Sequence, residues 1–373
     1  MWEKLVNKLL EKSEVKLGED IIIDNKSAYR DFILKGSLGF GESYMEGKWD
    51  SPHLDVLVAK ILNAQIEQNR FIGTLTDNIL RLRSVLLNLQ TKKYAPDLYE
   101  THYNAGNHLF ESFLDENMIY TCAYFQNTDD LTQAQLDKIK IVGEKLHLQP
   151  EDNVLDIGCG WGGTARILSE MFGCRVTGVS NTPNQIIYAL EHNSHDRVRF
   201  FLSDYRDIDG IFNKIYNIGF LEAVGPKNFR GFMELVDKNL DNDGIFLTHT
   251  IGSMESVECT DPWLDKYIFP HGVIPSRVQI DNSVRGIFEE RDFEAFGEYY
   301  DTTLMNWNQR FNDNWDSIKH NFKHPDEFKR MMNYYFLICA ASFRVGKNDL
   351  WHLVYTKPGH ATDYQTYRLP IIK

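Results

Sequence analysis

The stretch Val154-Leu-Asp-Ile-Gly-Cys-Gly-Trp-Gly-Gly163 decides the fold of this chain of 373 residues. A short apolar run carries one acid, Asp156, and leads directly into a cluster of glycines. Glycine has no Cβ, so the chain can turn tightly there and a ligand can reach the main chain. The pattern predicts a parallel strand that delivers backbone groups to a nucleotide-like ligand. A glycine turn without a ligand is the alternative, but one tight turn would not require so many glycines.

Two kinds of ligand are compatible with this turn. Gly158, Gly160 and Gly163 satisfy G-x-G-x-x-G, the dinucleotide fingerprint, which by itself is a weak signal. The fingerprint also needs an acid about 20 residues further on, at the end of the second strand, to bind a ribose. That strand ends here in Val179 and Ser180, so the required acid is missing.

The acid in this sequence precedes the glycines instead. An acid before G-x-G-x-G is the usual arrangement in methyltransferases that use S-adenosylmethionine (SAM), which has a ribose, an adenine and an amino-acid tail but no pyrophosphate. We therefore expect a SAM site formed in part by Asp156, Gly158, Gly160, Val179 and Ser180. An oxidoreductase that binds NAD is the disfavoured alternative.

From about residue 150 the sequence alternates between strand and helix patterns. We expect strands at 154–157, 175–179, 198–202, 214–220, 245–250 and 350–355, and helices at 164–172, 185–193 and 229–240. This alternation predicts an α/β fold, a Rossmann-like doubly wound sheet of the class I SAM methyltransferases. Ligands of such sheets bind beyond the carboxyl ends of the strands, where we expect the site residues.

The segments outside the predicted sheet differ from it in pattern. Residues 1–95 show helical spacing of apolar side chains, for example at Leu54, Leu57 and Val58, which predicts a separate helical domain. Residues 255–345 are aromatic and rich in short helical signals. An insert at this position predicts a roof over an apolar substrate.

Two interpretations of residues 1–95 stay open. Arg81, Arg83, Lys92 and Lys93 flank the apolar stretch Val85-Leu-Leu87. The first interpretation is a helical module packed on a core. The second is a surface that meets anionic lipid headgroups. The pattern alone does not separate them.

The overall composition excludes several classes of protein. The net charge of −13 argues against nucleic acid as a bulk partner, so any membrane contact must use a local basic patch or an apolar face. Five scattered cysteines without a C-x-x-C pair predict free thiols in a reducing cytoplasm, and no metal site is expected. The N-terminus lacks the apolar region of a signal peptide, and no run of about 18 apolar residues predicts a spanning helix.

Polar residues follow the second and third predicted strands. Thr182 and Gln185 are placed to reach the ribose or the methionine tail of SAM, although Thr182 can equally be a plain helix cap. Asp204 is placed to bond the adenine amino group, and Tyr205 to pack beside the ring. A solvated loop acid is the alternative for Asp204.

A second group of residues indicates chemistry. Glu222 follows the fourth strand between apolar neighbours, which predicts a carboxylate that is hydrogen-bonded or has a raised pKa. His249 closes the fifth strand, and a Glu and a His at adjacent strand ends favour a catalytic role over a structural one. Cys122, in Tyr120-Thr-Cys-Ala-Tyr124, has no visible base or positive neighbour, so its backbone N–H is expected to matter more than its sulfur.

Further motifs extend over nearly the whole chain. They are Phe40-Gly-Glu-Ser-Tyr-Met-Glu-Gly47, His102-Tyr-Asn-Ala-Gly-Asn107, Tyr120–Tyr124, Val154–Gly163, Asp204-Tyr-Arg-Asp207, Val224-Gly-Pro-Lys-Asn228, Phe246–Gly252, Asp261–Pro270, Tyr300-Asp-Thr-Thr-Leu-Met305 and Phe343-Arg344 before Leu350-Trp351. In these motifs and their order, the chain resembles the cyclopropane fatty acid and mycolic acid cyclopropane synthases, a family of SAM-dependent methyltransferases. Chance recurrence of so many ordered motifs is not credible.

The resemblance implies a reaction and the residues that support it. The family transfers the SAM methyl group to the cis double bond of an acyl chain, within a membrane phospholipid for the bacterial synthases. A bound bicarbonate then removes a proton from the carbocation, and a cyclopropane ring closes. The resemblance implies that Glu222, His249 and Tyr300 hold the bicarbonate, together with backbone groups of Cys122 and Ile251.

The resemblance also implies an organisation. A lipid-facing domain at 1–95 precedes a catalytic domain at 96–373, in which Tyr120 and Thr121 belong to the SAM contacts. We expect a cytoplasmic homodimer, peripheral to the inner face of the membrane, that acts on a phospholipid with an unsaturated acyl chain. Two alternatives stay open. A trapped cation gives a methyl-branched or methylene lipid, and a degenerate site makes the protein a lipid-binding scaffold.

Overall fold

The computed structural model describes most of the chain. The described residues are 1–65, 83–84, 87–92, 106–359 and 364–367. Several residues named above lie outside this part, namely Arg81, Val85, Leu86, Lys93 and residues 102–105 of the His102–Asn107 motif. Their predicted roles stay predictions.

The chain forms two compact units, each made of segments that are separated in the sequence. The helical unit comprises Met1–Phe113, Val257–Gly272 and Tyr300–Asn348. The sheet unit comprises Leu114–Ser256, Val273–Tyr299 and Asp349–Lys373. The predicted division into domains at residue 95 concerns function as well as structure, and it stays a prediction.

Helices make up most of the helical unit. They are α1 (Trp2–Leu10), α2 (Ser27–Met45), α3 (Leu54–Asn63), α6 (Asn107–Glu111), α12 (Pro262–Tyr267), α14 (Glu298–Ile318), which enters this unit at Tyr300, the 3-10 helix η4 (Lys319–Asn321) and α15 (Pro325–Arg344). A small antiparallel sheet of β1 (Ile22–Ile23) and β2 (Trp49–Asp50) was not expected, because two-residue strands are too short to show alternation. Among the described residues, no helix is both long and apolar enough to cross a bilayer.

The motif at 40–47 folds around one buried tryptophan. Trp49 is fully buried, and its ring lies 4.3 Å from the Phe40 ring and 5.0 Å from the Tyr44 ring, measured between centroids. Its indole N–H donates to the Phe40 carbonyl at 3.0 Å and to the Ser43 hydroxyl at 3.1 Å. A buried indole needs such a partner, so this motif supplies both packing and a hydrogen bond.

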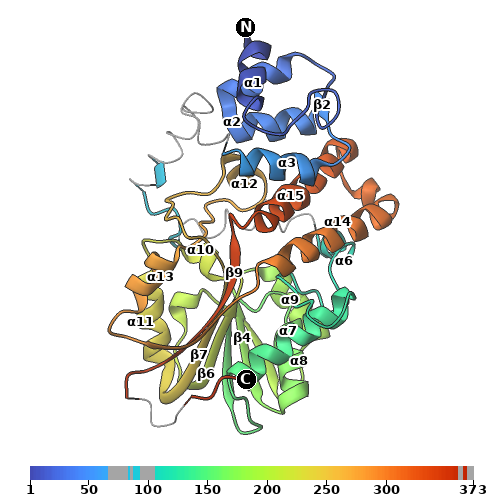
Figure 1. Cartoon of the computed structure of the whole chain (residues 1–373). Helices are drawn as coiled ribbons and strands as arrows, with labels where there is room; N and C mark the ends of the chain where they lie inside the picture. The colour runs from blue at the N-terminus through green and yellow to red at the C-terminus, as the bar shows by residue number, and fades with distance from the viewer. Residues whose placement is uncertain (66–82, 85–86, 93–105, 360–363, 368–373) are drawn as a thin grey trace. The chain divides into compact units, whose positions relative to one another are not determined.

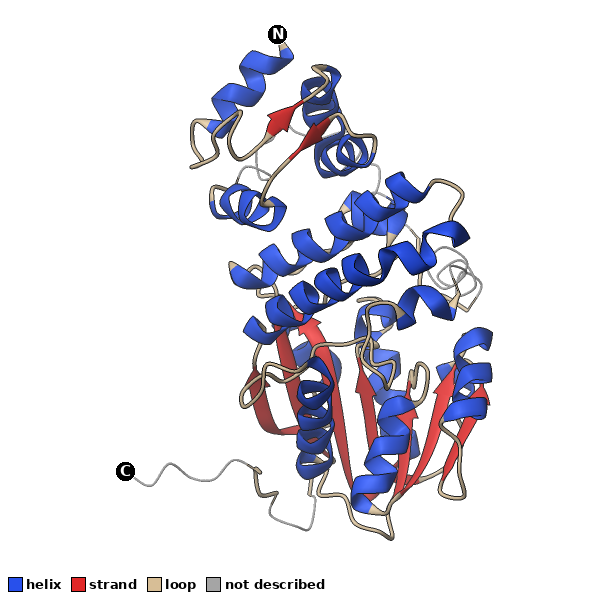
Figure 2. Ribbon diagram, turned by 90° about the vertical axis from the view of Figure 1, so that its right-hand side faces the viewer, coloured by secondary structure: helices blue, strands red, loops and turns tan. Residues whose placement is uncertain are grey.

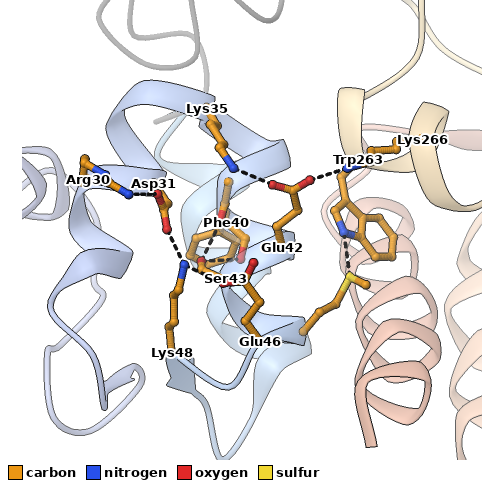
Figure 3. Close-up of polar contacts among 12 residues, drawn as sticks. Arg30, Asp31, Lys35, Phe40, Glu42, Ser43, Glu46, Lys48, Trp263 and Lys266 are labelled. Atoms are coloured by element: carbon orange, nitrogen blue, oxygen red, sulfur yellow. Dashed lines mark hydrogen bonds and ion pairs between the residues drawn. The ribbon is translucent and has the colours of Figure 1, made fainter. Parts of the chain in front are cut away.

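Glu42 in the same motif joins α2 to α12 (Figure 3). One carboxylate oxygen lies 2.8 Å from Lys35 Nζ, and the other lies 2.6 Å from Lys266 Nζ. The Tyr267 hydroxyl donates to the second oxygen at 3.2 Å. Segments more than two hundred positions apart in the sequence therefore meet in one ion cluster, termed the Glu42 cluster below.

The sheet unit contains the predicted α/β fold. Its strands are β3 (Asn153–Ile157), β4 (Arg175–Ser180), β5 (Val198–Leu202), β6 (Phe212–Ile218), β7 (Leu240–Gly252), β8 (Glu289–Ala295) and β9 (Asp349–Thr356). They are ordered β5-β4-β3-β6-β7-β9-β8, parallel from β5 to β7 and antiparallel at β9 and β8. This confirms the doubly wound sheet of the class I SAM methyltransferases, with two antiparallel strands added at one edge.

Helices cover both faces of this sheet (Figures 1 and 2). They are α7 (Leu131–Lys145), α8 (Gly163–Phe172), α9 (Pro183–His192), the short α10 (Leu221–Val224), α11 (Phe229–Asn239) and α13 (Arg277–Val284). Neighbouring strand residues enter different cores. Ile215 and Phe246 pack in the core with α11 and α13, whereas Tyr216 and Leu247 pack in the core with α7, α8 and α9. Strands buried on both faces explain the continuous apolar runs in the sequence.

Two details of the expected strands were wrong. β8 lies within the segment that was expected to be helical, because Glu289–Ala295 forms an edge strand whose charged side chains hide the alternation. β7 continues to Gly252, so His249 lies inside a strand and not at its end. The strand expected at 245–250 ends earlier than the backbone pairing of β7 with β9, which continues to Gly252.

Candidate active site

Asp156, the acid of the glycine motif, lies inside β3 and is buried. Its carboxylate accepts a hydrogen bond of 2.8 Å from the hydroxyl of Tyr216, which stands opposite it on β6. Burial raises the pKa of Asp156 to about 7, and the hydrogen bond from Tyr216 opposes that shift. The acid is therefore bonded within the sheet, and its contact with SAM stays a prediction.

Main-chain hydrogen bonds tie the glycine turn to the end of β4. The amides of Gly158 and Cys159 both donate to the Val179 carbonyl, at 2.9 and 3.0 Å. The predicted residues Gly158 and Val179 are thus brought together by backbone contacts. The turn is held at the carboxyl ends of two adjacent parallel strands, where ligands of such sheets bind.

Gly160 differs from the other glycines of the turn. A Cβ at Gly158 would collide with the Phe220 ring, and one at Gly162 would collide with the Phe200 ring. Gly160 has φ +54°, and a Cβ there would meet no protein atom within 4 Å. Gly158 and Gly162 permit close packing of the phenylalanine rings, whereas Gly160 leaves the main chain open on one side. This geometry fits the close approach that SAM requires.

A hydrogen-bonded loop follows β4. The Ser180 hydroxyl donates to Gln185 Oε1 at 3.1 Å and accepts from the Thr182 amide at 3.2 Å. All three side chains are buried. Thr182 occupies the N-cap position of α9, but its hydroxyl makes no capping hydrogen bond. Plain helix capping therefore does not account for this threonine hydroxyl.

Asp204 and Tyr205 follow β5 as predicted. The Asp204 carboxylate is nearly buried and accepts hydrogen bonds of 2.9 and 3.1 Å from the Arg206 guanidinium, which sequence reasoning had not identified as its partner. The Arg206 guanidinium also lies 4.5 Å from the centroid of the Tyr205 ring. Tyr205 packs edge-on against Phe220 at 5.5 Å, so its ring belongs to the wall beside the glycine turn. Asp204 is therefore not merely a solvated loop acid.

Glu222 lies in α10, directly after β6. One of its carboxylate oxygens accepts a 2.6 Å hydrogen bond from the Ile251 amide on β7. The other oxygen is shielded from solvent and has no hydrogen-bond partner among the described residues. Burial raises the pKa of Glu222 to about 7, although the Ile251 amide and the Thr250 hydroxyl favour the charged form. Two of the predicted residues are thus in direct contact, and the carboxylate is poised to exchange a proton near neutral pH.

His249 is fully buried on β7, the strand that also carries Ile251. Its Nδ1 lies 2.8 Å from Nε2 of His352, which sequence reasoning missed. Burial, together with the cations Lys138 and Lys145, holds the pKa of His249 well below its usual range. His249 is therefore a neutral hydrogen-bonding group and not a cation.

Cys122 has a positive neighbour that its local sequence does not show. Lys138 on α7 is fully buried, and its ammonium donates to the Thr121 hydroxyl at 2.7 Å. Burial lowers the pKa of Lys138 to about 8, and Cys122 and Asp115 oppose that shift electrostatically. The Cys122 thiol itself donates to the Ala123 carbonyl at 3.2 Å. Lys138 thus holds the segment that contains the predicted residues Tyr120, Thr121 and Cys122.

A sequence signal for Lys138 exists in α7. The buried residues of this helix include Leu131, Gln135, Lys138, Val142 and Lys145, which recur with a spacing of three or four. Polar side chains on such an apolar stripe are costly to bury without a partner. Gln135 has one as well, because its amide donates to the Thr121 carbonyl at 2.8 Å. Polar residues on the buried stripe of a helix therefore indicate groups that position a site.

Tyr300 belongs to the helical unit. It lies in the first turn of α14, where its ring stacks on Phe343 with centroids 4.6 Å apart and meets Trp307 edge-on at 6.0 Å. The other four residues predicted to hold bicarbonate belong to the sheet unit. The participation of Tyr300 with them stays a prediction.

Comparison with known proteins identifies the family. The family model of mycolic acid cyclopropane synthetase matches residues 90–353. This chain belongs to that family. It is 40% identical over 360 residues to the cyclopropane-fatty-acyl-phospholipid synthase of Escherichia coli (strain K12), an alignment that covers 95% of this chain and 94% of the relative. It is also 30% identical over 273 residues to a probable fatty acid methyltransferase of Pseudomonas putida, covering 69% and 68% of the two chains.

Solved structures of the mycolic acid cyclopropane synthetase family agree with this assignment. A cyclopropane synthase of Mycobacterium tuberculosis superposes with a TM-score of 0.65 at 26% identity, covering 70% of this chain and 98% of that one. A mycolic acid cyclopropane synthase complexed with SAH and CTAB superposes with a TM-score of 0.63 at 25% identity. The chain is thus a SAM-dependent methyltransferase of the cyclopropane synthase family, as its motifs indicate.

Proposed function

We propose that this protein transfers the methyl group of SAM to the cis double bond of an acyl chain in a membrane phospholipid and closes a cyclopropane ring. The observation that carries the proposal is the Glu222 carboxylate. It is shielded, its pKa is about 7, and the amide of Ile251 holds one of its oxygens. Similarity to the named phospholipid synthase of Escherichia coli over nearly the full length supports the same substrate class.

The residues of the sheet unit divide into two tasks in this proposal. SAM supplies an electrophilic methyl group when it is bound. The turn at Gly160 and the loop of Ser180, Thr182 and Gln185 hold it at the carboxyl ends of β3 and β4. An alkene is a weak nucleophile, so these residues must fix the methyl group in line and exclude water.

The second task is removal of a proton. Ring closure requires a base that does not itself bond to the carbocation, and a bicarbonate ion held by the protein meets this need. Glu222, His249 and Tyr300 are the proposed side-chain ligands, with the backbone of Cys122. The amide of Ile251 already donates to Glu222, so its proposed contribution is to fix that carboxylate. Glu222 can then accept the proton from the bicarbonate, because its pKa is about 7.

A product without a ring is the second candidate. The relative from Pseudomonas putida is named a probable fatty acid methyltransferase, so related chains are associated with methylated acyl chains as well. If the cation instead loses a proton from a neighbouring chain carbon, the product is a methyl-branched alkene. If a hydride shift moves the cation to the methylated carbon before the new methyl group loses a proton, the product is a methylene lipid. The same glycine turn serves both outcomes, and only the product separates them.

One experiment tests the reaction and the base together. Vesicles of a phospholipid with a cis-unsaturated acyl chain are incubated with the protein and methyl-labelled SAM, and the lipids are analysed by mass spectrometry. A cyclopropane adds one labelled CH2 and leaves no reducible double bond. Activity should fall when bicarbonate is depleted and recover when it is returned. A labelled lipid that still takes up hydrogen contradicts the ring, and activity independent of bicarbonate removes the proposed base.

Peripheral membrane contact by the N-terminal residues is part of the proposal. The helical unit exposes large apolar side chains at Leu5, Leu34 and Val56, and basic side chains near Leu87 include Arg83 and Lys92. Exposed apolar side chains together with basic ones suit contact with the inner face of a bilayer, and a homodimer would double weak contacts. Replacing Leu5 and Leu34 with Glu should reduce sedimentation with anionic vesicles while SAM binding is unchanged. Equal sedimentation of the wild type and this variant would contradict the membrane contact. Analytical ultracentrifugation measures whether the protein is a dimer.

A further inference from the structure

Two histidines face each other across the antiparallel strands β7 and β9. His249 and His352 are directly opposite in the register of the two strands, and Nδ1 of His249 lies 2.8 Å from Nε2 of His352. Both side chains are essentially inaccessible to solvent. Phe296 packs edge-on against both rings, at 6.1 Å from His249 and 4.8 Å from His352. The Phe296 ring therefore packs against both rings of the buried imidazole pair.

Only one nitrogen in this contact can carry the shared proton. Burial, then the cations Lys138 and Lys145, keep the pKa of both rings well below the usual histidine range, and for His352 the neighbouring His249 adds to this. Both imidazoles are therefore neutral, and a neutral imidazole has one N–H and one acceptor nitrogen. Either Nε2 of His352 donates to Nδ1 of His249, or Nδ1 of His249 donates to Nε2 of His352.

The far nitrogen of His352 decides between these arrangements. Its Nδ1 is shielded from solvent and has no hydrogen-bond partner among the described residues. If His249 donated, the proton of His352 would sit on this Nδ1 as a buried N–H without an acceptor. If His352 donates, the same Nδ1 is only an unused acceptor. Buried N–H groups without a partner are the rarer and costlier case, so the second arrangement is favoured.

We propose that His352 is a positioning residue that donates from Nε2 to His249 and thereby fixes the His249 proton on Nε2. The Nε2–H of His249 is directed away from His352 and serves as a hydrogen-bond donor to an anion in the site. This inference rests on the proposed function, because the anion is the bicarbonate suggested there. It adds the reason why His249 presents a donor and not a lone pair: the partner ring across the strand sets the tautomer.

The tautomer is measured directly by NMR on the full chain with 15N-labelled histidine. Long-range 1H–15N correlation spectra distinguish a protonated ring nitrogen from an acceptor. Signals that move or vanish in a His352→Gln variant assign the pair. The expected result is a protonated Nε2 and an unprotonated Nδ1 on both rings. A protonated Nδ1 on His249 would overturn the proposal, whatever the enzyme's response to bicarbonate.

Two substitutions separate positioning from packing. In His352→Gln an amide can still donate to His249, so turnover should stay within about threefold of wild type. In His352→Leu the donor is lost, and kcat should fall about 10- to 100-fold, the usual effect of removing a ligand's supporting partner. KM for SAM should change less than about twofold, since a tautomer error affects the anion site only. Full activity of His352→Leu, or an equal loss in both variants, would count against the proposal.

The outcomes also separate this inference from the reaction on which it rests. If activity proves independent of bicarbonate while the measured tautomer is as expected, the proposed base is wrong and the role of His352 in fixing His249 stands. If activity depends on bicarbonate while His249 carries its proton on Nδ1, the base stands and the positioning role is wrong. Should His352→Leu fail to fold, the spectrum of the wild-type protein still decides.

Discussion

Glu42 and Glu222 are two glutamates that the structure treats in opposite ways. Glu42, in the helical unit, is held by Lys35 and Lys266 (Figure 3). It also accepts a hydrogen bond from the Tyr267 hydroxyl. Among the described residues, the donors near the carboxylate of Glu222, in the sheet unit, are amide and hydroxyl groups. Burial tends to raise the pKa of both, but the two lysines overcome this at Glu42 and lower its pKa. At Glu222 burial prevails, and the pKa rises to about 7.

The difference shows how to tell a binding glutamate from a reacting one. A carboxylate between two cations is always ionised at neutral pH, so it can hold helices together but cannot exchange protons. In a buried carboxylate without a cation, burial disfavours the charged form and raises the pKa, so the group can accept a proton near neutral pH. The residue type is the same at both positions, so the type alone does not separate the two roles.

The largest expected effect is that of Glu222→Gln. The amide keeps the shape of the side chain but cannot accept a proton, so turnover should fall about 10²- to 10⁴-fold. SAM binding, measured by calorimetry, should change little, because no SAM contact is proposed for this side chain. The matched control is Glu42→Gln, which should retain turnover within about twofold. Full activity of Glu222→Gln would remove the carboxylate from the mechanism and end the contrast between the two residues.

The pH dependence of Glu222 has a defined sign. The pKa in the folded protein is about 7, and the ionised form is the proposed acceptor, so kcat should decrease as the pH falls below 7. The effect on stability is opposite. A raised pKa stabilises the fold at low pH, and this contribution is lost as the pH rises through 7. Glu222→Gln should therefore gain thermal stability relative to wild type above pH 7. A flat difference in melting temperature between pH 5 and 8 would contradict the raised pKa.

The next effect concerns the donor site. Gly160→Val should weaken SAM binding about a hundredfold or more, roughly 3 kcal/mol, because the new side chain fills the open side of the turn. Gly18 in the helical unit is the matched control, because it also has a positive φ and no protein atom within 4 Å of a Cβ. Gly18→Val should carry a similar backbone strain and leave SAM affinity unchanged. An equal loss of affinity in both variants would show that strain, and not the ligand's space, causes it.

A smaller effect is expected at Lys138, which acts through Thr121. Lys138→Met removes the 2.7 Å hydrogen bond to the Thr121 hydroxyl and should weaken SAM binding about fivefold to tenfold, roughly 1 kcal/mol. Lys140→Met is the control, because Lys140 lies on the same helix with an exposed side chain. Isothermal calorimetry on both variants checks the difference. Unchanged affinity in Lys138→Met would make this lysine a packing residue.

The sequence predicts the parts that are local and periodic. The apolar run before Gly158 predicts the strand β3, and Asp156 predicts SAM as the ligand in place of a dinucleotide. Both signals lie within a few residues of the glycine turn. Lys138 was missed although it lies on the buried stripe of α7, because the spacing indicates burial and does not name its partner Thr121. His352 was missed because a contact across a sheet leaves no spacing rule. β8 was missed because an edge strand is not buried on both faces.

The smallest expected effect concerns the stability of the Glu42 cluster. Glu42→Gln should lower the stability at pH 7 by about 1 kcal/mol, because it leaves two half-exposed lysines without a carboxylate. The sign of the pH dependence is the reverse of that at Glu222. A lowered pKa contributes stability above the unfolded value of 4.5, and this contribution is lost as the pH falls through the lower folded pKa. The melting temperatures of Glu42→Gln and wild type should therefore differ at pH 7 and converge below pH 4.

Glu46→Gln, which changes a half-exposed partner of Lys48, controls for the loss of one negative charge. A difference that persists at low pH would mean that Glu42 stabilises the helical unit by packing, and the contrast with Glu222 would then be one of shape and not of charge.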